Sequence, residues 1–348
     1  MTTTVLEVEH LGVTFATEDG PVLAVKDMSF AVRPGEILAL VGESGCGKTV
    51  TAMSIPGLLP SDGVARSGTV RLAGRDLTTL AERELESLRG KDISVVFQEP
   101  MTSLNPAYTV GKQIVEVLRR HQSLNRGQAL DRAVELLTLV GIPDARRRCT
   151  SFPHQLSGGM RQRVMIAMAL ALEPRVVIMD EPTTALDVVT QREILEELIG
   201  LRDRLGFAVL FITHDLSLLI ELADSIAVMY AGRLVERASA AALFRSPRHP
   251  YTRGLLNSFP SLHGEWRRMT GIAGSPPDLR HVPSGCAFHP RCPHAFDRCS
   301  AETPKLVEIG GGDQSRVVSC WLHDSAAPGT PAVPEDLALP EPMIGSAS

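Results

Sequence analysis

The sequence has few aromatic residues and no long hydrophobic run, and both shortages restrict what the chain can be. Phe, Trp and Tyr together make up 4% of its 348 residues. The longest apolar run, residues 164–172, is far shorter than the roughly 20 residues that cross a bilayer as a helix. The N-terminal residues lack the basic-then-apolar pattern of a secretion signal. We therefore expect a cytosolic chain whose contact with any membrane depends on a partner.

An excess of basic residues is also missing. The chain has 35 Lys and Arg against 40 Asp and Glu, a net charge of −5, so its composition gives no support to a nucleic-acid partner. Its 44% apolar content is typical of a globular protein, and its length suffices for about two domains. We expect a globular protein that binds no nucleic acid.

Residues 42–49 read GESGCGKT and match the phosphate-binding pattern G-x-x-x-x-G-K-[ST]. The apolar segment before them predicts a buried strand over residues 36–41, and the residues after them favour a helix up to Pro56. The glycines let the backbone turn tightly, so that its N–H groups point at phosphate oxygens. Lys48 is then placed to reach the β- and γ-phosphates, and the Thr49 hydroxyl can bind Mg²⁺.

Three further polar residues come at the ends of apolar runs that predict buried strands. Gln98, Asp180 and His214 each follow such a run. Strands that alternate with helices predict an α/β fold with a mainly parallel sheet, and ligands bind such sheets at the carboxyl ends of the strands. Together with Gly42, these residues predict one site assembled from four distant segments.

Two other regions complete the predicted fold. Residues 4–34 contain short alternating segments with a hairpin-turn signal at Asp19, which predicts an antiparallel β region. Residues 110–172 are largely helical in pattern. Ser-Gly-Gly at residues 157–159 begins the last of these helices, and its free backbone N–H groups could bind an anion. Capping-box spacing at Thr190 predicts the start of the next helix.

These ordered motifs together resemble the nucleotide-binding subunit of ATP-binding cassette (ABC) transporters, over residues 4–244. The resemblance implies a P-loop NTPase fold with a RecA-like core, an antiparallel β subdomain and a helical subdomain over about residues 99–172. It also implies that each ATP lies between the phosphate loop of one subunit and the signature segment, residues 156–162, of a second subunit. Glu181 would activate the attacking water, and His214 would contact the γ-phosphate.

The site residues that the resemblance implies fall into three groups. The catalytic residues are Glu181, His214 and Gln98. The magnesium-binding residues are Thr49, Gln98 and Asp180. The nucleotide-binding residues are Gly42, Ser44, Gly45, Cys46, Gly47, Lys48, Thr49, Val50, Phe15, Ser157, Gly158, Gly159 and Gln162. Phe15 would stack on adenine, with a role in the strand core as the alternative.

Residues 248–256 and 285–292 resemble the C-terminal region of oligopeptide/dipeptide importer ATPases, which we place at residues 245–323. Four cysteines fall within it: Cys286, Cys292, Cys299 and Cys320. Disulfides are not expected in the cytosol, and four thiolates suit a [4Fe–4S] cluster or a structural Zn²⁺. We favour the cluster, because the tight C-x2-4-C pairs of zinc sites are absent; zinc or metal-free cysteines are the alternatives. Residues 324–348, rich in Pro and small residues, predict a disordered tail.

The resemblances imply the ATPase subunit of an ABC importer for peptides, held at the cytoplasmic face of the membrane by two transmembrane permease subunits. A second cassette, expected to be a paralogous chain, and an extracytoplasmic solute-binding protein would complete the transporter. Nickel or oligosaccharide cargo is the alternative within this class. A soluble ABC ATPase that acts on nucleic acid or ribosomes is the alternative class, and a kinase with the same loop would leave the signature segment without a role.

Overall fold

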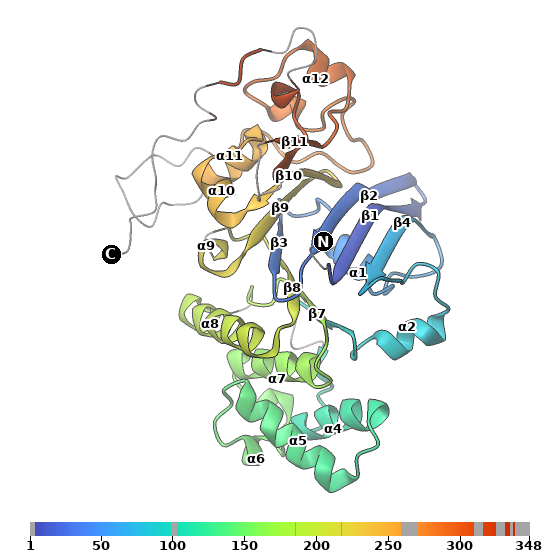
Figure 1. The fold of residues 1–348 in the computed structure, drawn as a ribbon, viewed down its shortest axis with the longest axis vertical. Coiled ribbons are helices and arrows are strands. Elements are labelled where there is room, and N and C mark those ends of the chain that lie inside the picture. The colour runs from blue at the N-terminus through green and yellow to red at the C-terminus, as the bar shows by residue number, and fades with distance from the viewer. Residues whose placement is uncertain are drawn as a thin grey trace.

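The computed structural model describes residues 4–98, 103–184, 186–216, 218–258, 271–309, 316–324, 331–334 and 337. Within these residues the strands form a 4-stranded sheet and an 8-stranded sheet. Figure 1 shows the larger sheet through the middle of the molecule, the smaller sheet beside it, and a group of helices at the end opposite the C-terminal region. None of the described helices combines the length and hydropathy that a bilayer span needs.

The smaller sheet is antiparallel and built on a long hairpin. Its strands are β1 Leu6–Thr17, β2 Gly20–Val32, β4 Val64–Leu72 and β5 Arg75–Asp76, in the spatial order β2-β1-β4-β5. The turn predicted at Asp19 joins β1 to β2, which confirms the hairpin. The prediction of short separate segments was wrong, because irregularities in the pairing near Leu11 and Val13 let each strand bend and continue.

The larger sheet has a parallel centre that holds the predicted strand ends side by side. Its parallel strands are β3 Ile37–Val41, β6 Ile93–Val96, β7 Val176–Asp180, β8 Ala208–Thr213 and β9 Ser225–Tyr230. β3 lies between β8 and β9, and β7 lies between β8 and β6. Every residue of β3, β7 and β8 is buried, as expected for strands covered on both faces. The predicted α/β fold with a mainly parallel sheet is confirmed.

The helical part agrees with the prediction except at one helix start. The helices up to β9 are α1 Lys48–Ser54, α2 Glu82–Leu88, α4 Val110–His121, α5 Arg126–Leu139, α6 Ala145–Arg148, α7 Gly158–Leu170, α8 Val188–Leu205 and α9 Leu219–Leu222. Figure 1 shows α4, α5 and α6 at one end of the molecule, with α7 between them and the sheet. The cap predicted at Thr190 is wrong. The Asp187 carboxylate caps α8 instead, because it accepts hydrogen bonds from the N–H and the hydroxyl of Thr190 at 3.0 and 2.8 Å.

The C-terminal region is joined to the larger sheet. The elements after β9 are β10 Arg233–Ser239, α10 Ala240–Arg245, α11 Pro250–Asn257, α12 Asp297–Ala301, β11 Val307–Ile309 and β12 Arg316–Val318. β12 pairs antiparallel with β10, and β11 pairs with β12. Glu236 of β10 is fully buried and accepts hydrogen bonds from Arg316 at 2.6 Å and from the N–H groups of Arg248 and His249 at 2.9 and 2.8 Å. The Glu236 carboxylate therefore connects β10 of the larger sheet to the C-terminal region.

The predicted tail, residues 324–348, falls largely outside the described residues. Of the tail residues that are described, Leu337 is completely buried, and its N–H donates a hydrogen bond to the carbonyl oxygen of Pro334 at 2.9 Å. The disorder of the tail stays a prediction.

Candidate active site

The phosphate loop, residues 42–49, leads from the end of β3 into α1. A Cβ atom at Gly47, where φ is 107°, would lie 2.4 Å from a backbone carbonyl oxygen of β2, so only glycine fits. Lys48 is 6% exposed, and its Nζ donates hydrogen bonds to the carbonyl oxygens of Gly42 and Glu43 at 2.8 and 3.1 Å. The ammonium group is therefore held inside the loop, where phosphate oxygens can replace the carbonyls as its partners.

Thr49 and Asp180 form the part of the site suited to a magnesium ion. The Thr49 hydroxyl donates a hydrogen bond to the Asp180 carboxylate at 3.2 Å, and Asp180, the last residue of β7, is 2% exposed. Burial raises the pKa of Asp180, and the bond from Thr49 opposes that rise. A hydroxyl and a carboxylate are the hard oxygen ligands that Mg²⁺ takes, and a bound cation would offset the cost of the buried carboxylate. The two side chains fit the predicted ion.

Glu181 is the residue at which the predicted catalytic side chains meet. Its Oε2 accepts a hydrogen bond from Nε2 of Gln98 at 3.3 Å and lies 3.2 Å from Nδ1 of His214. The Thr184 hydroxyl donates to the same oxygen at 3.1 Å. The N–H of Glu181 donates to the carbonyl oxygen of Ile212 on β8 at 2.9 Å, which fixes the backbone where β7 ends. The ends of β6, β7 and β8 thus bring residues that are far apart in the sequence into direct contact.

The signature segment lies at the start of α7, on the helical side of the molecule, and not at the phosphate loop. Ser157 caps α7 by accepting a hydrogen bond from the N–H of Met160 at 3.3 Å. A Cβ atom at Gly159 would lie 2.6 Å from Cγ2 of Thr190, because the start of α7 packs against the start of α8. The serine and glycines therefore have local structural reasons to be where they are, besides any contact with a nucleotide.

Two of the predicted nucleotide contacts are in less accessible places. Gln162 is 0% exposed, and neither polar atom of its amide has a hydrogen-bond partner among the described residues. Phe15 is partly buried on β1, where it pairs with Val22 and Val64 and packs against the core. Gln162 is closed off from solvent, so a nucleotide contact would require its helix to shift, and both assignments stay predictions.

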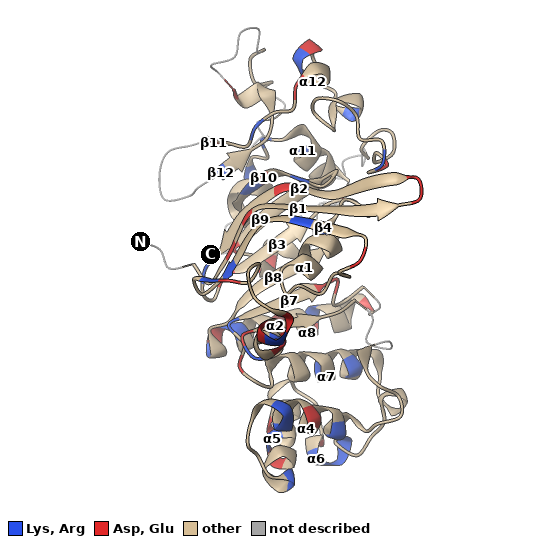
Figure 2. Ribbon diagram, turned by 90° about the vertical axis from the view of Figure 1, so that its right-hand side faces the viewer, with Lys and Arg blue, Asp and Glu red and all other residues tan. Residues whose placement is uncertain are grey.

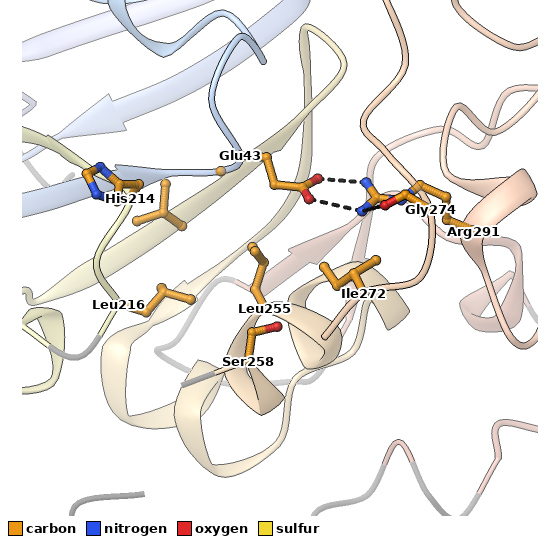
Figure 3. A pocket seen from close by; sticks show the side chains of 10 residues that line it. Glu43, His214, Leu216, Leu255, Ser258, Ile272, Gly274 and Arg291 are labelled. Carbon is orange, nitrogen blue, oxygen red and sulfur yellow. Dashed lines mark hydrogen bonds and ion pairs between the residues drawn. The ribbon is translucent and has the colours of Figure 1, made fainter. Parts of the chain in front are cut away.

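Glu43, inside the phosphate loop, has partners that the sequence reasoning missed. Its carboxylate is bound by the guanidinium of Arg291, and its N–H donates a hydrogen bond to the Tyr251 hydroxyl at 2.9 Å. Arg291 is 248 residues away along the chain, and no spacing or motif signals the pair. The pair lines a cavity of about 280 Å³. Figure 3 shows it together with His214 and the apolar side chains Leu216, Leu255 and Ile272, which line the same cavity.

The four cysteines predicted to hold a cluster line one cavity of about 10 Å³, and all are free thiols. Burial raises the pKa of Cys292 to about 11 and that of Cys320 to about 12, so both thiols are protonated at neutral pH when no cation is bound. In the part of the chain that the structure describes, no three His, Cys, Asp or Glu side chains are arranged as a metal site. The donor set suits a cluster, but the arrangement as it stands does not support one.

Comparison with known proteins gives a consistent set of relatives. The family model "ABC transporter" matches residues 25–184, and the model "Oligopeptide/dipeptide transporter, C-terminal region" matches residues 235–299. The chain is 46% identical over 311 residues to the dipeptide transport ATP-binding protein DppD of Escherichia coli, covering 89% of this chain and 95% of that protein. It is 48% identical over 299 residues to the oligopeptide transport ATP-binding protein OppD of Salmonella typhimurium, covering 86% and 89%.

Solved structures agree with these relatives. A dimeric post-hydrolysis state of the ATP-binding cassette MJ0796, bound to ADP and Pi, has a TM-score of 0.61 and 26% identity, and the match covers 68% of this chain and 98% of that one. The cbiO1 protein of Clostridium perfringens, part of an ABC transporter complex, has a TM-score of 0.59 and 27% identity, with 70% and 91% covered.

Proposed function

The chain belongs to the ABC transporter family, and from this we propose that it is the ATP-binding and ATP-hydrolysing subunit of an importer for di- and oligopeptides. The match covers 95% and 89% of the relatives named for dipeptide and oligopeptide transport, and the model of the oligopeptide/dipeptide transporter C-terminal region matches this chain as well. Nickel or oligosaccharide cargo is the alternative, since a cassette subunit does not contact the cargo, which passes through the permease.

The observation that carries the enzymatic role is the contact of Gln98 and His214 with Glu181, next to the buried Asp180. Glu181 would take the proton of the attacking water as general base, held for that purpose by its neighbours. Lys48 would exchange its carbonyl partners for phosphate oxygens. The Mg²⁺ expected with ATP would be bound at Thr49 and Asp180, and it supplies charge neutralisation on the phosphates.

We further propose that two cassettes face each other, so that the signature segment of one completes the phosphate site of the other. The signature segment opens α7, whereas the phosphate loop opens α1 at the sheet, so one chain carries both halves. Val188 and Val189, at the start of α8 beside the signature glycines, are 76% and 69% exposed, as befits a contact surface. The second cassette would be a paralogous chain.

The remaining partners follow from membership of this family. The subunit works with membrane permeases and a solute-binding protein, and we propose two permease subunits that hold it at the cytoplasmic face of the membrane. Figure 2 shows both acidic and basic residues on α2, α4 and α5, and the net charge of −5 gives no support to the alternative of an ATPase that acts on nucleic acid.

Lys48→Ala tests the nucleotide site directly. Because Nζ of Lys48 is the charge that the loop holds for the phosphates, we expect ATP affinity to fall by at least about tenfold, the effect of one lost charge-assisted contact. Equilibrium binding of a fluorescent ATP analogue gives the dissociation constant. Lys91→Ala, a lysine outside the loop, should bind as the unaltered protein does. Equal affinity in the Lys48 variant would contradict the proposed site.

For the four cysteines we propose a [4Fe–4S] cluster, with Zn²⁺ as the alternative, on the strength of four thiols around one cavity. Bound metal would require the thiols to rearrange into a metal site and would release their protons. Anaerobically purified protein should then contain about four iron atoms per chain, and Cys320→Ser should lose them while Cys149→Ser should not. Zinc without iron supports the alternative, and metal-free protein that folds and assembles refutes both.

A further inference from the structure

We propose that Arg291 of the C-terminal region is a positioning residue for nucleotide binding, because it fixes Glu43 inside the phosphate loop. The inference rests on the proposed ATPase function and adds a residue that the phosphate-loop motif does not contain. It assigns the C-terminal region a direct part in shaping the nucleotide site.

The contact between Arg291 and Glu43 has the geometry of a strong pair. Nη1 and Nη2 of Arg291 donate to the two carboxylate oxygens of Glu43 at 2.7 and 3.0 Å, as Figure 3 shows. The Arg291 side chain is 7% exposed and that of Glu43 is 23% exposed. Two parallel charge-assisted bonds with little solvent access hold both the position and the orientation of the carboxylate.

The main chain of Glu43 is held as firmly as its side chain. Its N–H donates to the Tyr251 hydroxyl at 2.9 Å, and its carbonyl oxygen accepts from Nζ of Lys48 at 3.1 Å. Tyr251 is fully buried, with its ring centroid 4.5 Å from that of Tyr230 and 5.4 Å from that of Phe288. Glu43 therefore joins the C-terminal region to the lysine that the phosphates need.

Arg291 lies within the cysteine-containing segment and is itself held by hydrogen bonds to the backbone. It ends a short 3-10 turn, His289–Arg291, between Cys286 and Cys292. Its Nε donates to the carbonyl oxygen of Ala273 at 2.9 Å and its Nη2 to that of Gly274 at 3.3 Å, so backbone groups outside the phosphate loop also hold the guanidinium. The arginine is thus positioned before any nucleotide arrives, which is what preorganisation of the loop requires.

Charge gives Arg291 a second effect on the same step. The Glu43 carboxylate stands in a loop that has to accept a triphosphate, and an uncompensated carboxylate there would repel it. Arg291 neutralises that charge. Loss of the arginine should therefore weaken ATP binding, while the proton transfer at Glu181, which has its own partners, should keep its rate.

The test is a double-mutant cycle on ATP affinity, with Arg291→Gln, Glu43→Gln and the pair. We expect Arg291→Gln to raise the ATP dissociation constant roughly tenfold, with kcat at saturating ATP changed less than about twofold. In the Glu43→Gln background, Arg291→Gln should raise the ATP dissociation constant less than about threefold, because no carboxylate is left to neutralise. Arg291→Lys keeps the positive charge but cannot form two parallel hydrogen bonds. Its ATP dissociation constant should lie between those of the unaltered protein and Arg291→Gln.

The matched control is Arg280→Gln, in the same region and paired with the exposed Asp278, which should leave affinity unchanged. Circular dichroism checks that each variant is folded, and the Lys variant and the pair keep the test decisive if Arg291→Gln alone unfolds. An equal loss with and without Glu43, or no loss, would overturn the inference. Failure of the unaltered protein to bind ATP would instead overturn the proposed function together with it.

Discussion

The Glu181 carboxylate shows how a single residue takes its role from neighbours that are far away in the sequence. Gln98, Thr184 and His214 all contact its Oε2. The sequence predicted Gln98 and His214 from their places after apolar runs and Glu181 from the family resemblance, and the structure brings these three together. It did not predict the role of Glu43 or Arg291, because an ion pair between residues 248 positions apart leaves no local pattern.

Replacement of Glu181 tests its proposed role as the general base. Glu181→Gln keeps the size and the hydrogen-bonding capacity of the side chain but removes the proton acceptor, so kcat for ATP hydrolysis should fall by about 10²–10⁴ with ATP binding retained. Steady-state phosphate release measures the first quantity and equilibrium titration the second. Glu196→Gln, an exposed ion-pair partner on α8, should hydrolyse ATP at the normal rate. Normal turnover in the Glu181 variant would remove that residue from the base role.

At the scale of elements, the sequence patterns predicted the helices and strands reliably but predicted their first and last residues less well. α5 begins with a capping box formed by Asn125 and Gln128, which are three residues apart. α8 starts earlier than predicted. The carboxylate of Asp187, three residues before Thr190, accepts the hydrogen bond from the N–H of Thr190, so Asp187 and not Thr190 is the cap. The addition of β11 and β12 to the larger sheet was not foreseen, since these strands are short and depend on contacts with β10.

The anchor of β12 on β10 can be tested through Glu236. This carboxylate is fully buried and bound by Arg316, so Glu236→Gln leaves a largely buried cation without its partner. We expect the free energy of unfolding to fall by about 3 kcal/mol or more. Urea unfolding followed by tryptophan fluorescence measures it. Glu302→Gln, which removes an exposed partner of Arg298, should cost less than about 1 kcal/mol. Equal costs would mean that Glu236 is no anchor.

At the scale of the whole molecule, the main feature is that the two parts of the proposed nucleotide site lie in different places on one chain. The phosphate loop is at the end of β3, and the signature segment begins α7. The relative solved as a dimer with ADP and Pi has the same fold over 98% of its length. A facing cassette would supply the missing part.

Ser157→Asp separates the capping role of this residue from a contact with the nucleotide of the partner. Aspartate caps a helix as well as serine does, so the stability of α7 should be unchanged. A carboxylate facing phosphates should lower the ATPase rate at least tenfold, by an electrostatic effect worth about 1.4 kcal/mol or more. Thermal unfolding and ATPase assays on the same sample give both results. Asn125→Asp, the cap of α5, is the control and should be active. Full activity of the Ser157 variant would contradict the composite site.

The sequence by itself determined the phosphate loop, the order of strands and helices, and the residues at the strand ends, because glycine requirements and hydrophobic periodicity act over a few residues. Only the tertiary structure decided that Arg291 and Tyr251 hold Glu43, that β11 and β12 extend the sheet, and that Gln162 is buried. These depend on surfaces that meet after the chain has folded, and no local sequence pattern encodes which distant side chain will face which.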